Sequence, residues 1–366
     1  MLRVAFFVSP HGFGHAARAA AVAEALAAVH PELHPHFFTT VPRWFFDESL
    51  SSDFSYNRCE CDVGLVQATP LVEDPAATIT RLEVSPWSSP AAVDDLAEQL
   101  SSLGCALVVA DISPLGLRAA ARAGLPSVLV ANFTWDWIYE RLPEAPEALV
   151  SLGREMADDF AAAGLRIDAE PCCASTPGAV AVPPVARAPR SRRTAVRRRL
   201  GIPDHAPLVL ASMGGIRFRY GKLDHLGDAP DGAWVVVPGG AESVLRRGRL
   251  VLLPFHSRYY HPDLVGAADV VIGKLGYSTV AEASRAGTAM AYVARPGFPE
   301  SAVLARFVER HLNARELDSG AFESGDWLPT VVTLLERGRR PPAANDGAAA
   351  AATAIEARFP EVFGSA

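Results

Sequence analysis

The chain alternates short apolar runs with helix-forming segments, and this alternation constrains its fold more than any other feature. In the first half, strand-like runs at residues 3–8, 34–40, 106–111 and 126–132 alternate with helix-forming segments at 15–30, 91–104 and 114–124. Continuous apolar runs of this length are typical of strands buried on both faces of a parallel sheet. The first half therefore predicts a doubly wound α/β domain, whose sites lie beyond the carboxyl ends of its strands.

The same alternation starts again near residue 206. Strand-like runs occur at 207–213, 233–238, 249–255, 268–274 and 288–294, with a helix-forming segment at 278–287. The intervening residues are rich in proline and arginine, which indicates a linker with a short exposed helix. We predict an α/β protein with two doubly wound Rossmann-like domains, at 1–185 and 186–340, facing across a cleft. A final helix within 341–366 is expected to pack back toward the first domain.

Composition narrows the class of function. With 366 residues, 49% hydrophobic content and a net charge of −7, the chain is typical of a globular enzyme and not of a general nucleic-acid binder. The linker holds seven arginines in fourteen residues, but no aromatic residues are interleaved, so an exposed face is favoured over a nucleic-acid patch.

No apolar run approaches the ~18 residues of a membrane span, and the amino-terminal run leads into a glycine loop instead of a cleavage site. We therefore expect a cytoplasmic protein with no integral membrane segment. The five cysteines are expected to be reduced thiols, since a metal site built from Cys59, Cys61, Cys172 and Cys173 lacks the usual ligand spacing.

The turn after the first strand, "VSPHGFGHAAR" at residues 8–18, contains two histidines and two glycines. Gly12 and Gly14 allow a sharp turn or the close approach of a ligand. His15 falls at the start of the following helix, where a neutral ring can accept a proton. Asp111 ends the strand at 106–111, so it is expected at the same sheet edge, either orienting His15 or capping the next helix.

The segment "GKLGYSTVAEASRAG" in the second domain has the features of an anion site. Gly276, Ser278 and Thr279 begin a helix whose amides can bind a phosphate, and Lys274 adds a positive charge. Glu282 lies one turn further along, where its carboxylate can accept hydrogen bonds from sugar hydroxyls. Gly214 and Gly215 provide a second glycine turn. Because the P-loop pattern is absent, we predict a nucleotide diphosphate here but not phosphoryl transfer.

These segments resemble the GT-B glycosyltransferases that act on nucleotide-diphosphate sugars. "HGFGHAAR", "CDVGLVQA", "NFTWDWIYE", "PDLVGAADVVIGKLGYSTVAEA" and "ARPGFPE" are similar to the amino-terminal, glycosyltransferase-like half of the plant L-arabinokinases. The sugar-kinase half of those proteins has no counterpart in the sequence, so the resemblance does not imply kinase activity.

The resemblance implies a role for individual residues. It makes His15 the catalytic base and Asp111 its orienting partner, and it places Lys274, Ser278 and Thr279 at the diphosphate and Glu282 at the ribose. Phe255 and His256 in "LPFHS" fall where these transferases hold the nucleotide base. Glu300 falls where an acidic residue binds the donor sugar, although Ser301 replaces the glutamine that usually follows it. The acceptor side is expected to include His11, Gly12, Gly14, Asn132, Trp135 and Asp136, although core packing is favoured over an acceptor contact for the tryptophans of this segment.

We therefore predict an inverting glycosyltransferase that moves a sugar from a nucleotide-diphosphate sugar, with UDP favoured, to an acceptor hydroxyl. It is expected to need no metal and no cofactor, and its partners are a small-molecule donor and acceptor without nucleic acid. The alternatives are a non-catalytic nucleotide-sugar-binding or regulatory module, or an epimerase or hydrolase on the same fold. The presence of both His15 and Asp111 favours catalysis, because a pure binder needs no base.

Overall fold

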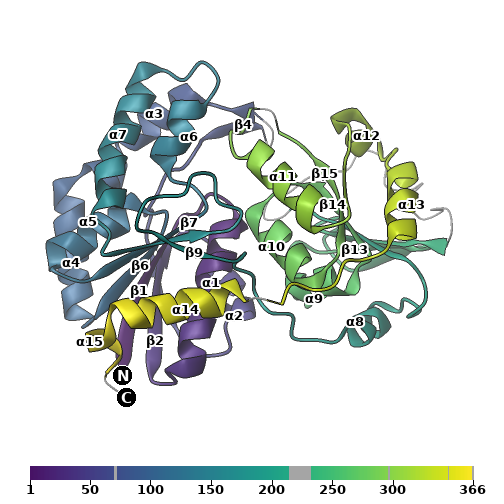
Figure 1. Ribbon diagram of the computed structural model, residues 1–366, viewed down its shortest axis with the longest axis horizontal. Helices are drawn as coiled ribbons and strands as arrows, with labels where there is room; N and C mark the ends of the chain where they lie inside the picture. The colour runs from purple at the N-terminus through teal and green to yellow at the C-terminus, as the bar shows by residue number, and fades with distance from the viewer. Residues whose placement is uncertain (70–71, 214–231, 296, 345, 365–366) are drawn as a thin grey trace. The chain divides into compact units, whose positions relative to one another are not determined.

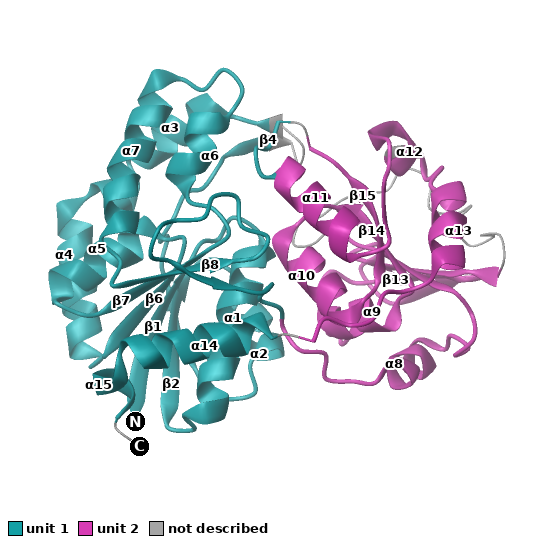
Figure 2. Cartoon of the chain, in the orientation of Figure 1, with its two compact units in different colours: residues 1–186, 297–300, 346–366 teal, residues 187–296, 301–345 magenta. Residues whose placement is uncertain are grey.

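The computed structural model describes residues 1–69, 72–213, 232–295, 297–344 and 346–364. The chain divides into two compact units (Figure 2). Unit 1 contains residues 1–186, 297–300 and 346–366, and unit 2 contains residues 187–296 and 301–345. The sequence had placed residues 297–300 in the carboxyl-terminal domain, whereas their contacts group them with unit 1.

Unit 1 is built on a seven-stranded sheet in the order β3-β2-β1-β6-β7-β8-β9, and all neighbouring pairs are parallel. The strands are β1 (Leu2–Val8), β2 (Leu33–Thr39), β3 (Ser55–Arg58), β6 (Leu107–Asp111), β7 (Ser127–Ala131), β8 (Leu165–Ala169) and β9 (Val180–Val182). The strand order reverses beside β1, and a sheet of this kind binds ligands at that reversal. The switch point of unit 1 therefore lies between β1 and β6, where Val8 pairs with Asp111.

Helices cover both faces of this sheet (Figure 1). The even-numbered side chains of β1 pack against α1 (Phe13–Val29), α2 (Arg43–Ser49) and α14 (Gly347–Arg358), and α14 lies along α1. The remaining helices are α3 (Pro75–Glu83), η1 (Pro86–Ser88), α4 (Pro90–Ser102), α5 (Pro114–Ala123), α6 (Trp135–Arg141), α7 (Glu147–Ala161) and α15 (Pro360–Phe363). A short antiparallel pair, β4 (Gln67–Thr69) and β5 (Val72–Glu73), completes the unit.

Unit 2 repeats the plan with a second seven-stranded sheet in the order β12-β13-β11-β10-β14-β15-β16. Its strands are β10 (Leu208–Ala211), β11 (Trp234–Pro238), β12 (Leu245–Arg247), β13 (Leu250–Leu253), β14 (Val270–Lys274), β15 (Ala289–Val293) and β16 (Ala314–Glu316). All are parallel except β12, which runs antiparallel to β13. The order reverses beside β10, so the switch point of unit 2 lies between β10 and β14.

The helices of unit 2 are α8 (Arg193–Leu200), α9 (His261–Ala267), α10 (Tyr277–Ala286), α11 (Ser301–His311), α12 (Ser319–Ser324) and α13 (Leu328–Arg337). The arginine-rich segment around α8 is not simply an exposed face, as the sequence had suggested. Arg197 is 1% exposed, pairs with Asp269 at 2.7 Å and donates to the carbonyl of Ala267 at 3.0 Å. Part of the arginine run therefore anchors α8 to the rest of unit 2.

Candidate active site

The structure brings His15 and Asp111 together at the switch point of unit 1. The imidazole Nδ1 lies 2.8 Å from the Asp111 carboxylate, and both side chains are buried. His15 is the third residue of α1, and Asp111 is the last residue of β6, the strand next to β1. Among the described residues, the other imidazole nitrogen, Nε2, makes no hydrogen bond.

The local backbone explains this placement. Gly12 has φ of 83°, a left-handed conformation that favours glycine, and it directly precedes α1 in the turn after β1. A Cβ built on Gly12 would meet no atom within 4 Å, so open space adjoins this turn. Gly14 lies inside α1 instead of in the turn. Asp111 is not the cap of α5, because Ser113 caps that helix by accepting from the Gly116 amide.

A third side chain, Arg18, completes this cluster, and it was not among the residues predicted from the sequence. The Arg18 guanidinium donates to both oxygens of Asp111, from Nε at 2.7 Å and from Nη2 at 2.6 Å. Burial would raise the pKa of Asp111, but the charge of Arg18 and the hydrogen bond from His15 outweigh burial and hold that pKa below its ordinary value. Asp111 is therefore a stable carboxylate, suited to orienting an imidazole.

Asn132 belongs to this cluster as well. Its side-chain oxygen accepts from Arg18, and its amide nitrogen donates to the carbonyl of Ala169 at 2.6 Å. In the structure the Asn132 amide is bonded to the protein at both ends and is 3% exposed, and it holds the Arg18 guanidinium. Its predicted place on the acceptor side stays a prediction.

A second buried carboxylate, Asp62, lies close to His15. It accepts a hydrogen bond from the indole of Trp135 at 2.6 Å and from the amide of Val63 at 2.8 Å. Burial raises its pKa to about 6, although hydrogen bonds from Ser9 and Trp135 and the nearby His15 oppose the rise. The sequence contained Asp62 in "CDVGLVQA" but gave no reason to place it here.

Aromatic rings surround the same place. The Trp135 ring centroid lies 5.4 Å from that of His11 and 6.4 Å from that of His15. Trp135 is 1% exposed, as a core residue would be, and its place on the acceptor side stays a prediction. Asp136 is half-buried in the first turn of α6, and its Oδ1 has no hydrogen-bond partner among the described residues.

In unit 2, the predicted anion site lies at the start of α10. Gly276 precedes the helix, no side chain caps it, and a Cβ on Gly276 would meet no atom within 4 Å. The first turn of α10, which includes Ser278 and Thr279, thus has no side-chain cap for its amides, and Lys274 is the last residue of the preceding strand, β14. This turn lies at the switch point between β10 and β14, where a doubly wound sheet binds ligands.

Glu282 lies one turn into α10 and is 3% exposed. Its Oε1 accepts from Arg187 at 2.9 Å, and its Oε2 lies 2.7 Å from Nδ1 of His261. The other nitrogen of His261 lies 3.0 Å from the Ser212 hydroxyl at the end of β10. Burial would raise the pKa of Glu282, but Arg187 and His261 outweigh it and lower that pKa. The sequence predicted Glu282 and missed Arg187 and His261.

The remaining predicted donor residues have different outcomes. Phe255 and His256 follow β13, with Phe255 half-buried and His256 exposed. Glu300 is 6% exposed and is grouped with unit 1, not with the predicted donor domain. Gly214 and Gly215 lie outside the described residues. The roles of all these residues remain predictions.

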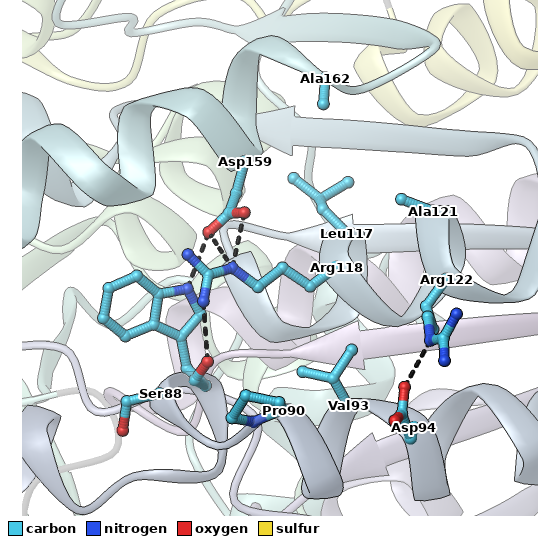
Figure 3. Close-up of a pocket in the computed structure, with 11 residues that line it drawn as sticks. Ser88, Pro90, Val93, Asp94, Leu117, Arg118, Ala121, Arg122, Asp159 and Ala162 are labelled. Carbon is cyan, nitrogen blue, oxygen red and sulfur yellow. Dashed lines mark hydrogen bonds and ion pairs between the residues drawn. The ribbon is translucent and has the colours of Figure 1, made fainter.

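A separate hollow of about 640 Å³ lies between α4, α5 and α7 in unit 1 (Figure 3). Arg118 and the indole of Trp87 both bind Asp159 there, at 2.7 Å each, and Arg122 pairs with Asp94 at its other end. Because each charged side chain in this hollow is paired with another, it has no unbalanced charge that would select a charged ligand.

The described residues contain no group of three metal-binding side chains, and the five cysteines are free thiols. Within the described part of the chain, no helix has the length and apolar character needed to cross a membrane.

Comparison with known structures identifies the fold. The calicheamicin glycosyltransferase CalG4 matches with a TM-score of 0.62 and 16% identity, covering 99% of each chain. The spinosyn forosaminyltransferase SpnP matches with a TM-score of 0.60 and 16% identity, covering 99% of this chain and 95% of its own. A UDP-glucosyltransferase from Polygonum tinctorium capable of glucosylating indoxyl matches with a TM-score of 0.61 and 13% identity, covering 100% and 99%. The chain has the GT-B fold, which confirms the predicted fold class.

The sequence is also similar to a curated protein. It is 29% identical over 330 residues to L-arabinokinase of Arabidopsis thaliana, which covers 89% of this chain and 31% of that protein. The chain thus spans about a third of the length of this relative. No protein-family model matches the chain. The predicted resemblance to GT-B glycosyltransferases and to part of L-arabinokinase is confirmed.

Proposed function

We propose that the chain is an inverting glycosyltransferase that uses a nucleotide-diphosphate sugar, with a UDP-sugar favoured. The observation that carries this proposal is the buried hydrogen bond of 2.8 Å between His15 and Asp111 at the switch point of unit 1. The GT-B fold makes sugar transfer the first reaction to consider, but the fold alone does not establish the activity. The site must therefore supply the chemistry.

In the proposed reaction, His15 acts as a general base. Because Asp111 accepts the Nδ1 proton, the ring is held in the tautomer whose Nε2 is unprotonated. Nε2 removes the proton of the acceptor hydroxyl, the oxygen attacks the anomeric carbon, and the nucleoside diphosphate leaves with the bonding electrons. A single displacement of this kind inverts the anomeric configuration. Asp111, itself fixed by Arg18, stabilises the imidazolium that forms. Base catalysis of this type is typically worth ~10²–10⁴ in rate.

In the same proposal, unit 2 binds the donor. The amides at the start of α10 and Lys274 receive the diphosphate and stabilise its charge as it leaves, a role that a metal ion fills in other enzymes. Glu282 is positioned by Arg187 and His261 to accept from the ribose hydroxyls. We therefore expect donor binding and turnover to persist in the presence of a metal chelator, and strict dependence on magnesium or manganese would contradict this account.

The test compares His15→Ala with the native protein. Nucleotide sugars are first screened by thermal shift, because a ligand that binds only the folded state raises its stability. Single-turnover rates are then measured with the donor found. We expect His15→Ala to fold and to keep donor affinity but to lose ~10²-fold or more in rate. Its melting temperature should fall, because the variant loses a buried hydrogen bond to Asp111. The matched control is His311→Ala, at an exposed position in unit 2, which should keep the native rate. A native rate in His15→Ala would contradict the proposal.

The second candidate is a non-catalytic nucleotide-sugar-binding module. It is favoured by one observation, that the chain resembles only a part of a protein named for a different reaction. This candidate predicts that the native protein binds a nucleotide sugar but consumes none with any acceptor offered. It also predicts that His15→Ala changes neither affinity nor turnover, which separates the two candidates.

A further inference from the structure

A second polar pocket lies toward the amino-terminal ends of the unit 1 strands, whereas His15 lies beyond their carboxyl ends. Its volume is about 280 Å³, and it is lined by Met1, Arg3, His34, His36, Ser55, Ser102 and Leu103. Its lining comes from the amino-terminal halves of β1, β2 and β3 and from the end of α4, whereas His15 follows the carboxyl end of β1. At ~3.3 Å per residue, the length of β1 separates the two places by about 20 Å. The proposed transfer reaction does not use this pocket.

Strand register explains why its polar side chains lie together. Arg3 pairs with His34 across β1 and β2, and His36 pairs with Ser55 across β2 and β3. Residues in register on neighbouring strands point to the same face of a sheet, as do residues two apart on one strand. Four polar side chains from three adjacent strands thus share one face.

His36 is the central residue of this pocket. It is 5% exposed, and neither of its ring nitrogens has a hydrogen-bond partner among the described residues. A buried ring with two unbonded nitrogens is costly unless a ligand or solvent molecule completes its hydrogen bonds. The ring is part of the lining of this pocket, so a molecule bound in the pocket lies beside it.

The neighbouring groups favour an anion as that ligand. Arg3 donates to the carbonyl of Leu103 at 2.9 Å, which holds the guanidinium at the pocket wall with further N–H groups for a ligand. The His34 ring lies 5.0 Å from that of His36, and its Nε2 lies 2.9 Å from the Ser55 hydroxyl. Burial, followed by the nearby His34 and Arg3, lowers the pKa of His36, as expected for a ring in positive surroundings.

A metal ion fits this pocket less well. Two histidines on one strand resemble half of a metal site, but the Arg3 guanidinium beside them repels a cation. Among the described residues no third histidine, cysteine, aspartate or glutamate joins them in a metal-binding group. The donor set instead contains a guanidinium, two imidazoles and a hydroxyl, which all donate hydrogen bonds to oxyanions.

We propose that this pocket is a binding site for a phosphate group, held by Arg3, His34, His36 and Ser55. The volume of the pocket exceeds that of the free ion and admits a small phosphate monoester. Two ligands would present this tetrahedral oxyanion: free phosphate and a phosphorylated small molecule. The experiment below distinguishes between them.

The experiment titrates the full chain by calorimetry with inorganic phosphate and, separately, with glycerol phosphate, against sodium chloride at matched ionic strength. The ring-proton NMR signals of His36 are followed in the same titrations. We expect saturable binding that shifts the His36 signals. Tighter binding of glycerol phosphate identifies a phosphorylated molecule as the source, and tighter binding of inorganic phosphate identifies the free ion.

Two variants test the residues. Arg3→Gln and His36→Phe should each weaken phosphate binding by about tenfold or more, since one hydrogen bond to a charged group is removed. Both should fold, because Arg3 is exposed and His36→Phe removes no existing hydrogen bond. The matched control is Arg154→Gln, an exposed position on α7 that should bind as the native protein does. Phosphate binding no stronger than that of chloride, unmoved His36 signals, or native affinity in both variants would each overturn the proposal.

Discussion

Removing Arg18 should destabilise the protein strongly, because it leaves a buried charge without its main partner. Arg18 is 5% exposed and donates to both oxygens of Asp111, which is itself 1% exposed. Breaking a buried ion pair by deleting one partner typically costs ~3–5 kcal/mol, most of it the penalty for the remaining charge. We therefore expect Arg18→Met to lower the free energy of unfolding by about that amount. Arg43→Met, at an exposed pair with Asp47, is the control and should leave the free energy of unfolding unchanged.

A double-mutant cycle tests the reason for this loss. In Arg18→Met, a further Asp111→Asn change removes the uncompensated charge, so the double variant should be more stable than Arg18→Met alone. Coupling between two residues in contact is ~0.5–3 kcal/mol, and we expect a value near the upper end here. Urea unfolding followed by far-UV circular dichroism measures all four proteins. Strictly additive losses, or a loss below about 1 kcal/mol in Arg18→Met, would refute the reasoning.

The pH dependence gives an independent check on the same pair. The pKa of Asp111 is held below its unfolded value of ~3.9, so its contribution to stability is present above that pH. The contribution is lost as the pH falls through the lower, folded pKa. The native protein should therefore lose stability relative to Asp111→Asn on acidification below about pH 4. In the Arg18→Met background this difference should shrink or reverse, because Arg18 is what lowers the pKa.

Three further outcomes are expected. Glu282→Gln should weaken nucleoside-diphosphate binding by ~1–3 kcal/mol, the cost of unpaired buried groups, and unchanged affinity by calorimetry would remove Glu282 from the site. Burial raises the pKa of Asp62 to about 6, so the folded state favours the protonated form and stability falls as the pH rises from ~4 to ~6. In urea unfolding, the native protein should then lose stability relative to Asp62→Asn across that pH window. A difference in the free energy of unfolding that stays constant across the window would contradict a raised pKa of Asp62. Arg118→Met should lower the melting temperature, since Asp159 is largely buried, whereas Arg122→Met should not, since its pair with Asp94 is exposed.

Much of the fold could be predicted because the strands of both sheets are continuous apolar runs. β1, β6, β7, β14 and β15 are buried along nearly their whole length, and such strands are evident in a single sequence. The edge strands β3 and β12 were missed, since their residues are partly or wholly exposed and carry no apolar run. The helix α7 was missed as well, although its buried positions are spaced like one helical face.

Site residues could be predicted where their own position at the end of a strand or the start of a helix places them. They could not be predicted where their hydrogen-bond partners come from distant segments of the chain. His15 follows from its position at the start of the first helix, and Asp111 from its position at the end of a strand. Asp62 reaches Trp135 across 73 residues, and Arg187 reaches Glu282 across 95, so no local pattern connects them. Arg18 is different, because it lies three residues after His15 and thus on the same face of α1. That spacing was a usable signal.

The two units place similar groups at their switch points, and one difference between them supports the proposal that His15, and not His261, is the base. In each unit a buried carboxylate binds one arginine and one histidine: Asp111 in unit 1 and Glu282 in unit 2. The second nitrogen of His261 is already bonded to Ser212, so His261 cannot accept a proton from a substrate without breaking that bond. Nε2 of His15 makes no hydrogen bond to any described residue, and its tautomer is fixed by Asp111. The arrangement in unit 2 suits a carboxylate held rigid for binding, and the arrangement in unit 1 suits proton transfer.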